Sequence, residues 1–365
     1  MIENIIIKNF KSIRDLNLRL TNLNILIGSN GVGKSNFISF FEMTKAIFEQ
    51  RFGSYTLEKG GIDNLLYRGR KVSREIYGLM DFKNTNAFFF TLKPAQSNKG
   101  YIENTGDYFN TRRERDKEYN ELWHKTFWDS GVEESALITQ TQWRASYLKD
   151  YLSSFTIYHF HDTSSSSPMR GQCEIDDNSF LRDNGENLAA YLYMLQKTNE
   201  QSFRLIEATI HSIAPYFKKF NLRPDPLSPN KISLEWEEVN SNMYLNGYSF
   251  SDGTIRFIAL TTLLLQPKLP EIIIIDEPEL GLHPAAINKL AALIKRAAKT
   301  SQIILSTQST NLVNCFEPEN IIVVDRENEQ SVFKRLNSDD LSVWMNEYNY
   351  SISDMWETNL IGGQL

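Results

Sequence analysis

The sequence predicts an α/β fold with a mixed sheet core, built from both ends of the chain and interrupted by an inserted helical lobe. Two observations carry this prediction. Between residues 5 and 27 three short apolar strands follow one another, then a glycine-rich loop, then apolar residues at helical spacing over 35–50. Between residues 272 and 324 short apolar runs alternate with helical segments, which is the rhythm of a buried parallel sheet.

Length and composition exclude several other classes. The chain has 365 residues and a net charge of −6, with 22 Phe, 16 Tyr and 6 Trp, so it is neither a basic nucleic-acid coat nor a disordered chain. Two cysteines cannot form a disulfide framework, the first residues lack a secretion signal, and the apolar stretches are far too short to span a membrane. We expect a cytoplasmic protein without a membrane partner.

The middle of the chain is less regular. Residues 76–82 and 87–92 are expected to form a strand pair, whereas 112–128, 133–154 and 185–220 are expected to be helical. Four consecutive serines and Pro168 predict a mobile loop near 162–172. We therefore expect a nucleotide-binding core over 1–100 and 228–365, and a mainly helical lobe over 101–227.

Residues 28–35 read Gly-Ser-Asn-Gly-Val-Gly-Lys-Ser between a predicted strand and a predicted helix, which is the pattern of a phosphate loop, or P-loop, of an NTPase. The glycines let the backbone amides point at a phosphate, and the helix N-terminus adds its positive dipole end. Lys34 would neutralise the β- and γ-phosphates, and the Ser35 hydroxyl would bind Mg²⁺. The predicted nucleotide-binding residues here are Gly28, Ser29, Asn30, Gly31, Val32, Gly33, Lys34, Ser35 and Asn36.

A second motif, residues 271–277, is an apolar strand that ends in two acids. Asp276 would complete the magnesium site with Ser35, and Glu277 would orient or deprotonate the attacking water. Acids after an apolar strand often mark only the start of a loop, but together with the phosphate loop they indicate a hydrolase.

Three further segments, 9–13, 250–254 and 277–284, resemble the ATP-binding-cassette (ABC) ATPase heads of the RecF, SMC and OLD group. They look like that group's N-terminal strand turn, its signature loop, and its second acidic motif running into the D-loop. The resemblance covers roughly residues 1–48 and 228–324. It implies an ABC-type P-loop ATPase that uses ATP and Mg²⁺, with two chains enclosing two ATP molecules head to tail.

Ser251 and Gly253 lie at the start of an apolar helix over 254–266, where a hydroxyl, amides and the helix dipole suit an anion. In the family this surface faces the γ-phosphate held by the other subunit. The simpler interpretation is that Ser251 only caps a core helix, and both can hold. Arg256, one turn further, is a candidate for contact with either nucleotide or partner.

Two positions depart from the family pattern. Asp252 stands where glycine is commonest in the general signature, which brings a negative charge near the phosphates. Gln308 stands where the family usually has the switch histidine, and its amide can donate a hydrogen bond to a phosphate but cannot become cationic. We therefore assign Gln308, Glu277 and Lys34 to catalysis and predict slow turnover.

The segment between Lys34 and Ser251 is too short and too aromatic for an SMC-length coil, and the residues after Val324 hold no acidic cluster like that of a Toprim nuclease domain. We therefore expect a compact head with an effector in trans. The leading hypothesis is a dimeric ATP-driven switch, or a higher oligomer, that controls a nuclease or toxin, as compact ATPases of bacterial anti-phage defence do. One alternative is a RecF-like repair ATPase acting on DNA, for which basic clusters such as 112–117 are candidate contacts. Another is a non-hydrolytic scaffold in which ATP holds an oligomer that sequesters a toxic partner.

Overall fold

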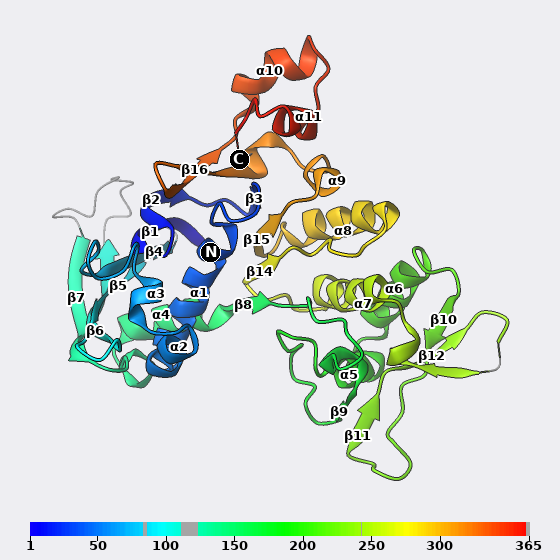
Figure 1. The fold of residues 1–365 in the computed structure, drawn as a ribbon. Coiled ribbons are helices and arrows are strands. Elements are labelled where there is room, and N and C mark those ends of the chain that lie inside the picture. The colour runs from blue at the N-terminus through cyan, green and yellow to red at the C-terminus, as the bar shows by residue number, and fades with distance from the viewer. Residues whose placement is uncertain (83–85, 111–122, 242, 363–365) are drawn as a thin grey trace. The chain divides into compact units, whose positions relative to one another are not determined.

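The computed structural model describes residues 1–82, 86–110, 123–241 and 243–362 (Figure 1). The chain forms two compact units, which are described separately below. Unit 1 contains Met1–Phe155 and Glu317–Leu365, and unit 2 contains Thr156–Phe316. Within the described ranges, no helix has the length and apolar character that crossing a membrane would demand.

The larger sheet of unit 1 has six strands in the order β2-β1-β4-β5-β6-β7, and all neighbours are antiparallel. The alternation of Leu16 and Leu18 with polar residues predicts one buried face, and both side chains are buried. The strands are β1 (Ile2–Phe10), β2 (Ile13–Arg19), β4 (Ile76–Phe82), β5 (Asn86–Pro94), β6 (Gly100–Asn110) and β7 (Trp123–Val132).

Strand β7 corrects the helix predicted over 112–128, of which residues 112–122 lie outside the described part of the chain. Residues 123–128 pair with β6 instead. They are rich in aromatic and β-branched residues, and Lys125 and Phe127 share one face, with the Lys125 ammonium 4.6 Å from the Phe127 ring centroid. Such residues favour a pleated, half-buried surface, which outweighed the charges that suggested a helix.

A second group of strands in unit 1 gives the mixed sheet that positions the phosphate loop. Strand β3 (Leu23–Ile27) runs parallel to β16 (Ile321–Glu327), and β16 pairs antiparallel with β17 (Gln330–Arg335). All five residues of β3 are buried, as expected for a central strand. The two ends of the chain therefore meet beside the loop that follows β3.

The helices of unit 1 pack through aromatic side chains. Helix α1 follows the phosphate loop, and Phe40 stacks on Phe90 of β5 with ring centroids 5.6 Å apart. Phe41 of the same helix contacts Phe155, which also belongs to unit 1. The helices are α1 (Lys34–Phe48), α2 (Phe52–Glu58), α3 (Ile62–Leu65), α4 (Trp143–Ser154), α10 (Ser338–Asn346) and α11 (Ile352–Glu357).

Unit 2 is built around helix α7 (Asp252–Leu265), which is buried along almost its whole length. It packs against α6 and α8 (Figure 1), and β14 runs parallel to β15 in the same unit. The other elements are β8 (Phe155–Tyr158), β9 (Gln172–Glu174), α5 (Leu188–Thr198), α6 (Glu200–His211), β10 (Phe217–Phe220), β11 (Lys231–Ser233), β12 (Glu235–Glu238), β13 (Tyr244–Asn246), β14 (Ile272–Asp276), α8 (Pro284–Ala297), β15 (Gln302–Thr307) and α9 (Thr310–Val313).

The compact units do not follow the predicted boundaries at residues 100 and 228. Residues 101–227 are divided between the two units, and they contain the long strands β6 and β7 as well as helices α4, α5 and α6. The helical region predicted over 185–220 contains two helices, α5 and α6, and is followed at its end by strand β10 instead of helix. The serine-rich segment, 162–172, packs into unit 2 at its end, where Arg170 is only 5% exposed.

Candidate nucleotide-binding site

The phosphate loop of unit 1 has a backbone that only glycine fits at two positions. A Cβ on Gly28 would lie 2.3 Å from the carbonyl oxygen of Val324, which belongs to β16. Gly33 has φ of 117°, and a Cβ there would lie 2.1 Å from Ser331 Oγ. The curled path of the loop therefore depends on the absence of side chains at these two positions.

Lys34 lies inside this curl. Its side chain is 5% exposed, and Nζ donates hydrogen bonds to the carbonyl oxygens of Gly28 at 2.6 Å and Ser29 at 2.9 Å. The buried hydroxyl of Ser29 has no hydrogen-bond partner among the described residues. A buried cation and an unsatisfied hydroxyl at a helix N-terminus fit a phosphate group, and exposed Ser35 follows in the first turn of α1.

A pair of serines far apart in the sequence braces the loop, and sequence reasoning missed its role. Ser331 Oγ in β17 donates to the carbonyl of Val32 and lies 2.6 Å from Ser12 Oγ. Asn36, predicted to bind nucleotide, donates to Ser12 Oγ at 2.7 Å. These contacts connect the N-terminal strand turn, the loop and β17, and only the fold could reveal them.

The acidic strand of unit 2 ends beside its parallel neighbour β15. Asp276 is in register with Ser306, whose hydroxyl donates to the Asp276 carboxylate. Glu277 has φ of 39°, a left-handed conformation unusual for glutamate, and its amide donates to Ser306 O at 3.0 Å. The side-chain amide of Gln308 donates to the Glu277 carboxylate. The structure thus brings together Asp276, Glu277 and Gln308 at the ends of two adjacent strands.

A third carboxyl, Glu279, was not predicted to matter. Glu279 is 8% exposed. Its carboxylate accepts hydrogen bonds from the Thr307 hydroxyl and from the backbone amide of Gln308, the latter at 3.3 Å. Burial raises the pKa of Glu279, and its Oε2 has no hydrogen-bond partner among the described residues. Glu279 therefore links the segment that follows β14 to Thr307 and Gln308 at the end of β15.

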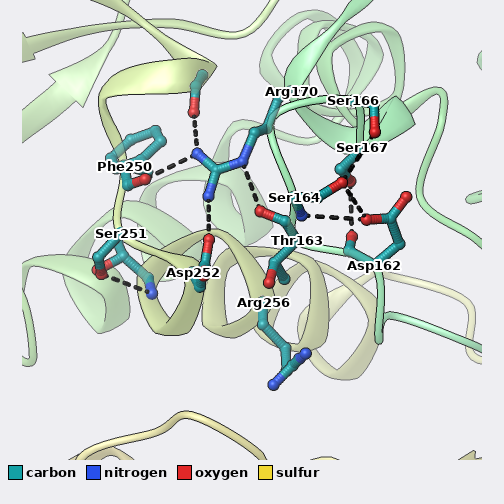
Figure 2. Close-up of polar contacts among 12 residues, drawn as sticks. Asp162, Thr163, Ser164, Ser166, Ser167, Arg170, Phe250, Ser251, Asp252 and Arg256 are labelled. Carbon is teal, nitrogen blue, oxygen red and sulfur yellow. Dashed lines mark hydrogen bonds and ion pairs between the residues drawn. The ribbon is translucent and has the colours of Figure 1, made fainter.

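The signature loop begins helix α7 with a side-chain cap. The amide of Thr254 donates to Ser251 Oγ at 3.2 Å, so the simpler capping interpretation holds in this structure. A Cβ on Gly253 would lie 2.3 Å from the carbonyl oxygen of Gly281, so glycine is needed for the helix start to reach the D-loop. The side chain of Asp252 is bound by Arg170, at 2.7 Å (Figure 2).

Arg256 contacts backbone carbonyls of its own unit in this structure. Its guanidinium is 4% exposed and donates to three backbone carbonyls of unit 2, those of Phe160 and His161 at 2.8 Å each and that of Leu280. Burial lowers the pKa of Arg256. Through these hydrogen bonds, the guanidinium connects α7 to the D-loop and to the segment that follows β8.

Mg²⁺ and ATP fit the chemistry of these residues. In unit 1 the phosphate loop offers amides, a lysine and a serine to phosphates. Ser35 in unit 1 and Asp276 in unit 2 each carry an oxygen of the kind that Mg²⁺ prefers. His159 and His161, with rings 6.3 Å apart, do not extend this set, since no group of three His, Cys, Asp or Glu suited to a metal is found in the described part of the chain.

The mixed sheet, phosphate loop, acidic strand and signature helix define an ABC-type P-loop ATPase, as the comparisons with known proteins show. The chain belongs to the family described as "AAA domain, putative AbiEii toxin, Type IV TA system", whose model matches residues 23–314. The fold class predicted from the sequence is therefore confirmed.

Two solved structures share this fold. An Smc head bound to the C-winged helix domain of ScpA has a TM-score of 0.61 at 16% identity, covering 93% of this chain and 99% of that chain. An Smc head with an extended coiled coil, bound to the C-terminal domain of ScpA derived from Pyrococcus furiosus, has a TM-score of 0.57 at 14% identity, with coverages of 96% and 99%.

One curated relative is the phosphate import ATP-binding protein PstB of Mycoplasmoides gallisepticum, strain R(low / passage 15 / clone 2). It is 25% identical over 120 residues, which are 32% of this chain and 36% of that protein. The chain thus matches about a third of the length of this relative, and the similarity supports ATP binding.

Proposed function

We propose that this chain binds Mg·ATP, hydrolyses it slowly as a head-to-tail dimer, and acts as a nucleotide-driven switch on a partner effector in the cytoplasm. The observation that carries the proposal is the hydrogen bond from Gln308 to Glu277. It places a donor that cannot become cationic on the carboxylate suited to orient water, as expected of a slow ATPase.

Each predicted residue then has a role. Lys34 and the loop amides bind the phosphates, Ser35 and Asp276 hold Mg²⁺, and Glu277 orients the attacking water. Bound Mg²⁺ would neutralise charge that develops on the phosphate oxygens. Ser251 and Gly253 of a second copy would face the γ-phosphate, so that neither copy completes the site alone.

The choice of an effector in trans has two supports. The SMC head that resembles this chain was solved bound to a domain of another protein, ScpA. The family description names a toxin of a type IV toxin–antitoxin system. A nuclease or toxin regulated by ATP-dependent dimerisation, in anti-phage defence, accords with both, and the nucleotide-binding core is proposed to use residues 1–100 and 228–365.

The variant Glu277→Gln tests the proposed sandwich, that is, the dimer in which two chains enclose two ATP molecules head to tail. The carboxamide keeps the side chain's shape but cannot act as a base, so ATP should remain bound and the mass measured by light scattering should double on addition of Mg·ATP. Lys34→Ala/Glu277→Gln is the matched control, which should stay monomeric because the phosphates lose their cation. A Glu277→Gln protein with unchanged mass at saturating ATP would overturn the dimer.

The scaffold and RecF-like alternatives predict different results from the switch. A scaffold would keep its biological effect in Glu277→Gln, whereas a switch would lose the effect or lock it on, as a phage challenge would show. Duplex DNA binding that weakens steeply with salt, and that disappears when the charges of 112–117 are removed, would favour the RecF-like alternative instead.

A further inference from the structure

Arg170 and Asp252 form an ion pair at the start of the signature helix (Figure 2). The guanidinium of Arg170 comes from the end of the serine-rich segment and is 5% exposed, whereas the Asp252 side chain is 70% exposed. Their closest atoms, Arg170 Nη2 and Asp252 Oδ1, are 2.7 Å apart. A fixed, buried cation thus holds a mostly solvent-exposed carboxylate.

The rest of the guanidinium is bound by backbone carbonyls. Nη1 donates to Gly247 at 2.8 Å and to Phe250 at 2.7 Å, and Nε donates to Thr163 at 3.0 Å. These bonds define the direction in which Nη2 points, because a planar guanidinium presents its donors in a rigid fork. The pair is therefore built into the turn that precedes α7.

The charge of Asp252 is the reason such a pair matters. Asp252 lies between Ser251 and Gly253, the two residues proposed to face the γ-phosphate of a second copy. A carboxylate there would repel the phosphate, since like charges brought together at an interface are strongly unfavourable. Arg170 supplies the compensating charge from the side of the protein interior.

We propose that Arg170 is a positioning residue of the signature loop, which neutralises and holds Asp252 so that the loop can accept the γ-phosphate of the partner copy. This inference rests on the proposed sandwich. It predicts that the need for Arg170 disappears when the charge of residue 252 is removed, which a purely structural role in holding carbonyls does not predict.

A double-mutant cycle in the Glu277→Gln background tests this. The measured quantity is the dissociation constant of the ATP-bound dimer. Arg170→Gln keeps an amide donor but loses the charge and should weaken the dimer by about tenfold. Asp252→Asn alone should leave the dimer at least as tight, because the Arg170 cation stays. The double variant should return to within about threefold of the background protein.

Two outcomes would overturn the role of Arg170 while leaving the proposed dimer intact. The first is a double variant as weak as Arg170→Gln, which would assign Arg170 to holding the carbonyls. The second is a tenfold loss in Asp252→Asn, a variant that keeps Arg170 and so does not depend on Arg170→Gln folding. Thermal unfolding without nucleotide gives an independent check, since the pair predicts non-additive melting temperatures.

Failure of the proposed function has a different signature. If the Glu277→Gln background itself shows no ATP-dependent dimer while the melting temperatures are non-additive, the pair exists but the sandwich is wrong. The role of Arg170 in the sandwich falls with it. An ATP-dependent dimer in the background, with no coupling in either measurement, would overturn only the role of Arg170.

Discussion

The side-chain amide of Gln308 donates a hydrogen bond to the carboxylate of Glu277. Gln308 follows β15 and Glu277 follows β14, so the contact joins the ends of two parallel strands. The position where the family usually has histidine therefore contacts the acid itself in this structure. We expect its first task to be the orientation of Glu277.

Replacement of Gln308 by Leu removes this donor at similar volume. We expect the kcat for ATP hydrolysis to fall by about ten- to a hundredfold. This is less than the roughly 10²–10⁴-fold that a general base contributes, because Gln308 positions Glu277 and does not replace it, and KM should change less than about threefold. Steady-state phosphate release checks this. A raised KM with unchanged kcat would instead place Gln308 in ground-state binding of ATP.

Ser331→Ala tests the brace of the phosphate loop. The carbonyl of Val32 and the hydroxyl of Ser12 would each lose a buried partner, which should lower the free energy of unfolding by about 1–2 kcal/mol. Nucleotide affinity should fall several-fold, since the loop that carries Lys34 loses a support. Fluorescent-nucleotide titration and urea unfolding measure the two effects.

The control is Ser342→Ala, the same chemical change at a partly exposed serine of α10 that donates to Asp339 O at 2.9 Å. Its nucleotide affinity should match wild type. Equal affinities in both variants would show that the Ser331 brace does not support the phosphate loop.

Asp107 of β6 makes stability depend on pH. Burial raises the pKa of this carboxyl from 3.8 to about 6, although Arg144 at 3.8 Å opposes the shift. Below pH 4 the carboxyl is protonated in both states. Between pH 4 and 6 only the unfolded state ionises, so the free energy of unfolding should drop by up to about 3 kcal/mol as pH rises.

Asp107→Asn removes this dependence. Urea unfolding at pH 4 and pH 8 should show that the wild type loses more stability than the variant over this interval. Parallel losses in the two proteins would contradict a raised pKa for Asp107.

Glu279→Gln should be tolerated, because burial raises the pKa of this carboxyl and one of its oxygens lacks a partner. Ionisation of Glu279 opposes folding as pH rises, so the variant should gain melting temperature relative to wild type at pH 8 compared with pH 5. Glu279→Ala should instead lose about 2 kcal/mol, since Thr307 is left without its acceptor. Thermal scans of the three proteins decide between these expectations.

Local patterns predicted the phosphate loop, β14 and α7 because strand period, glycine spacing and terminal acids lie within a few residues of one another. The same patterns missed Ser331, Arg170 and Glu279. Ser331 meets Ser12 across 319 positions, and Arg170 meets Asp252 across 82. Such contacts follow from the fold, and no local spacing marks them. The helix predicted over 112–128 was wrong for 123–128, because pairing with β6 outweighed local charge.

The contact between Gly253 and Gly281 has a mechanical consequence within unit 2. The backbones of Gly253 and Gly281 are in close contact, and Arg256 donates a hydrogen bond to the carbonyl of Leu280. We therefore expect the first turn of α7 and the D-loop to move together. Only three positions separate Leu280 from Glu277. A displacement at Ser251 would thus be transmitted over a short distance to Glu277, the acid proposed to orient water. In the proposed dimer, binding of the second copy would therefore affect the position of Glu277.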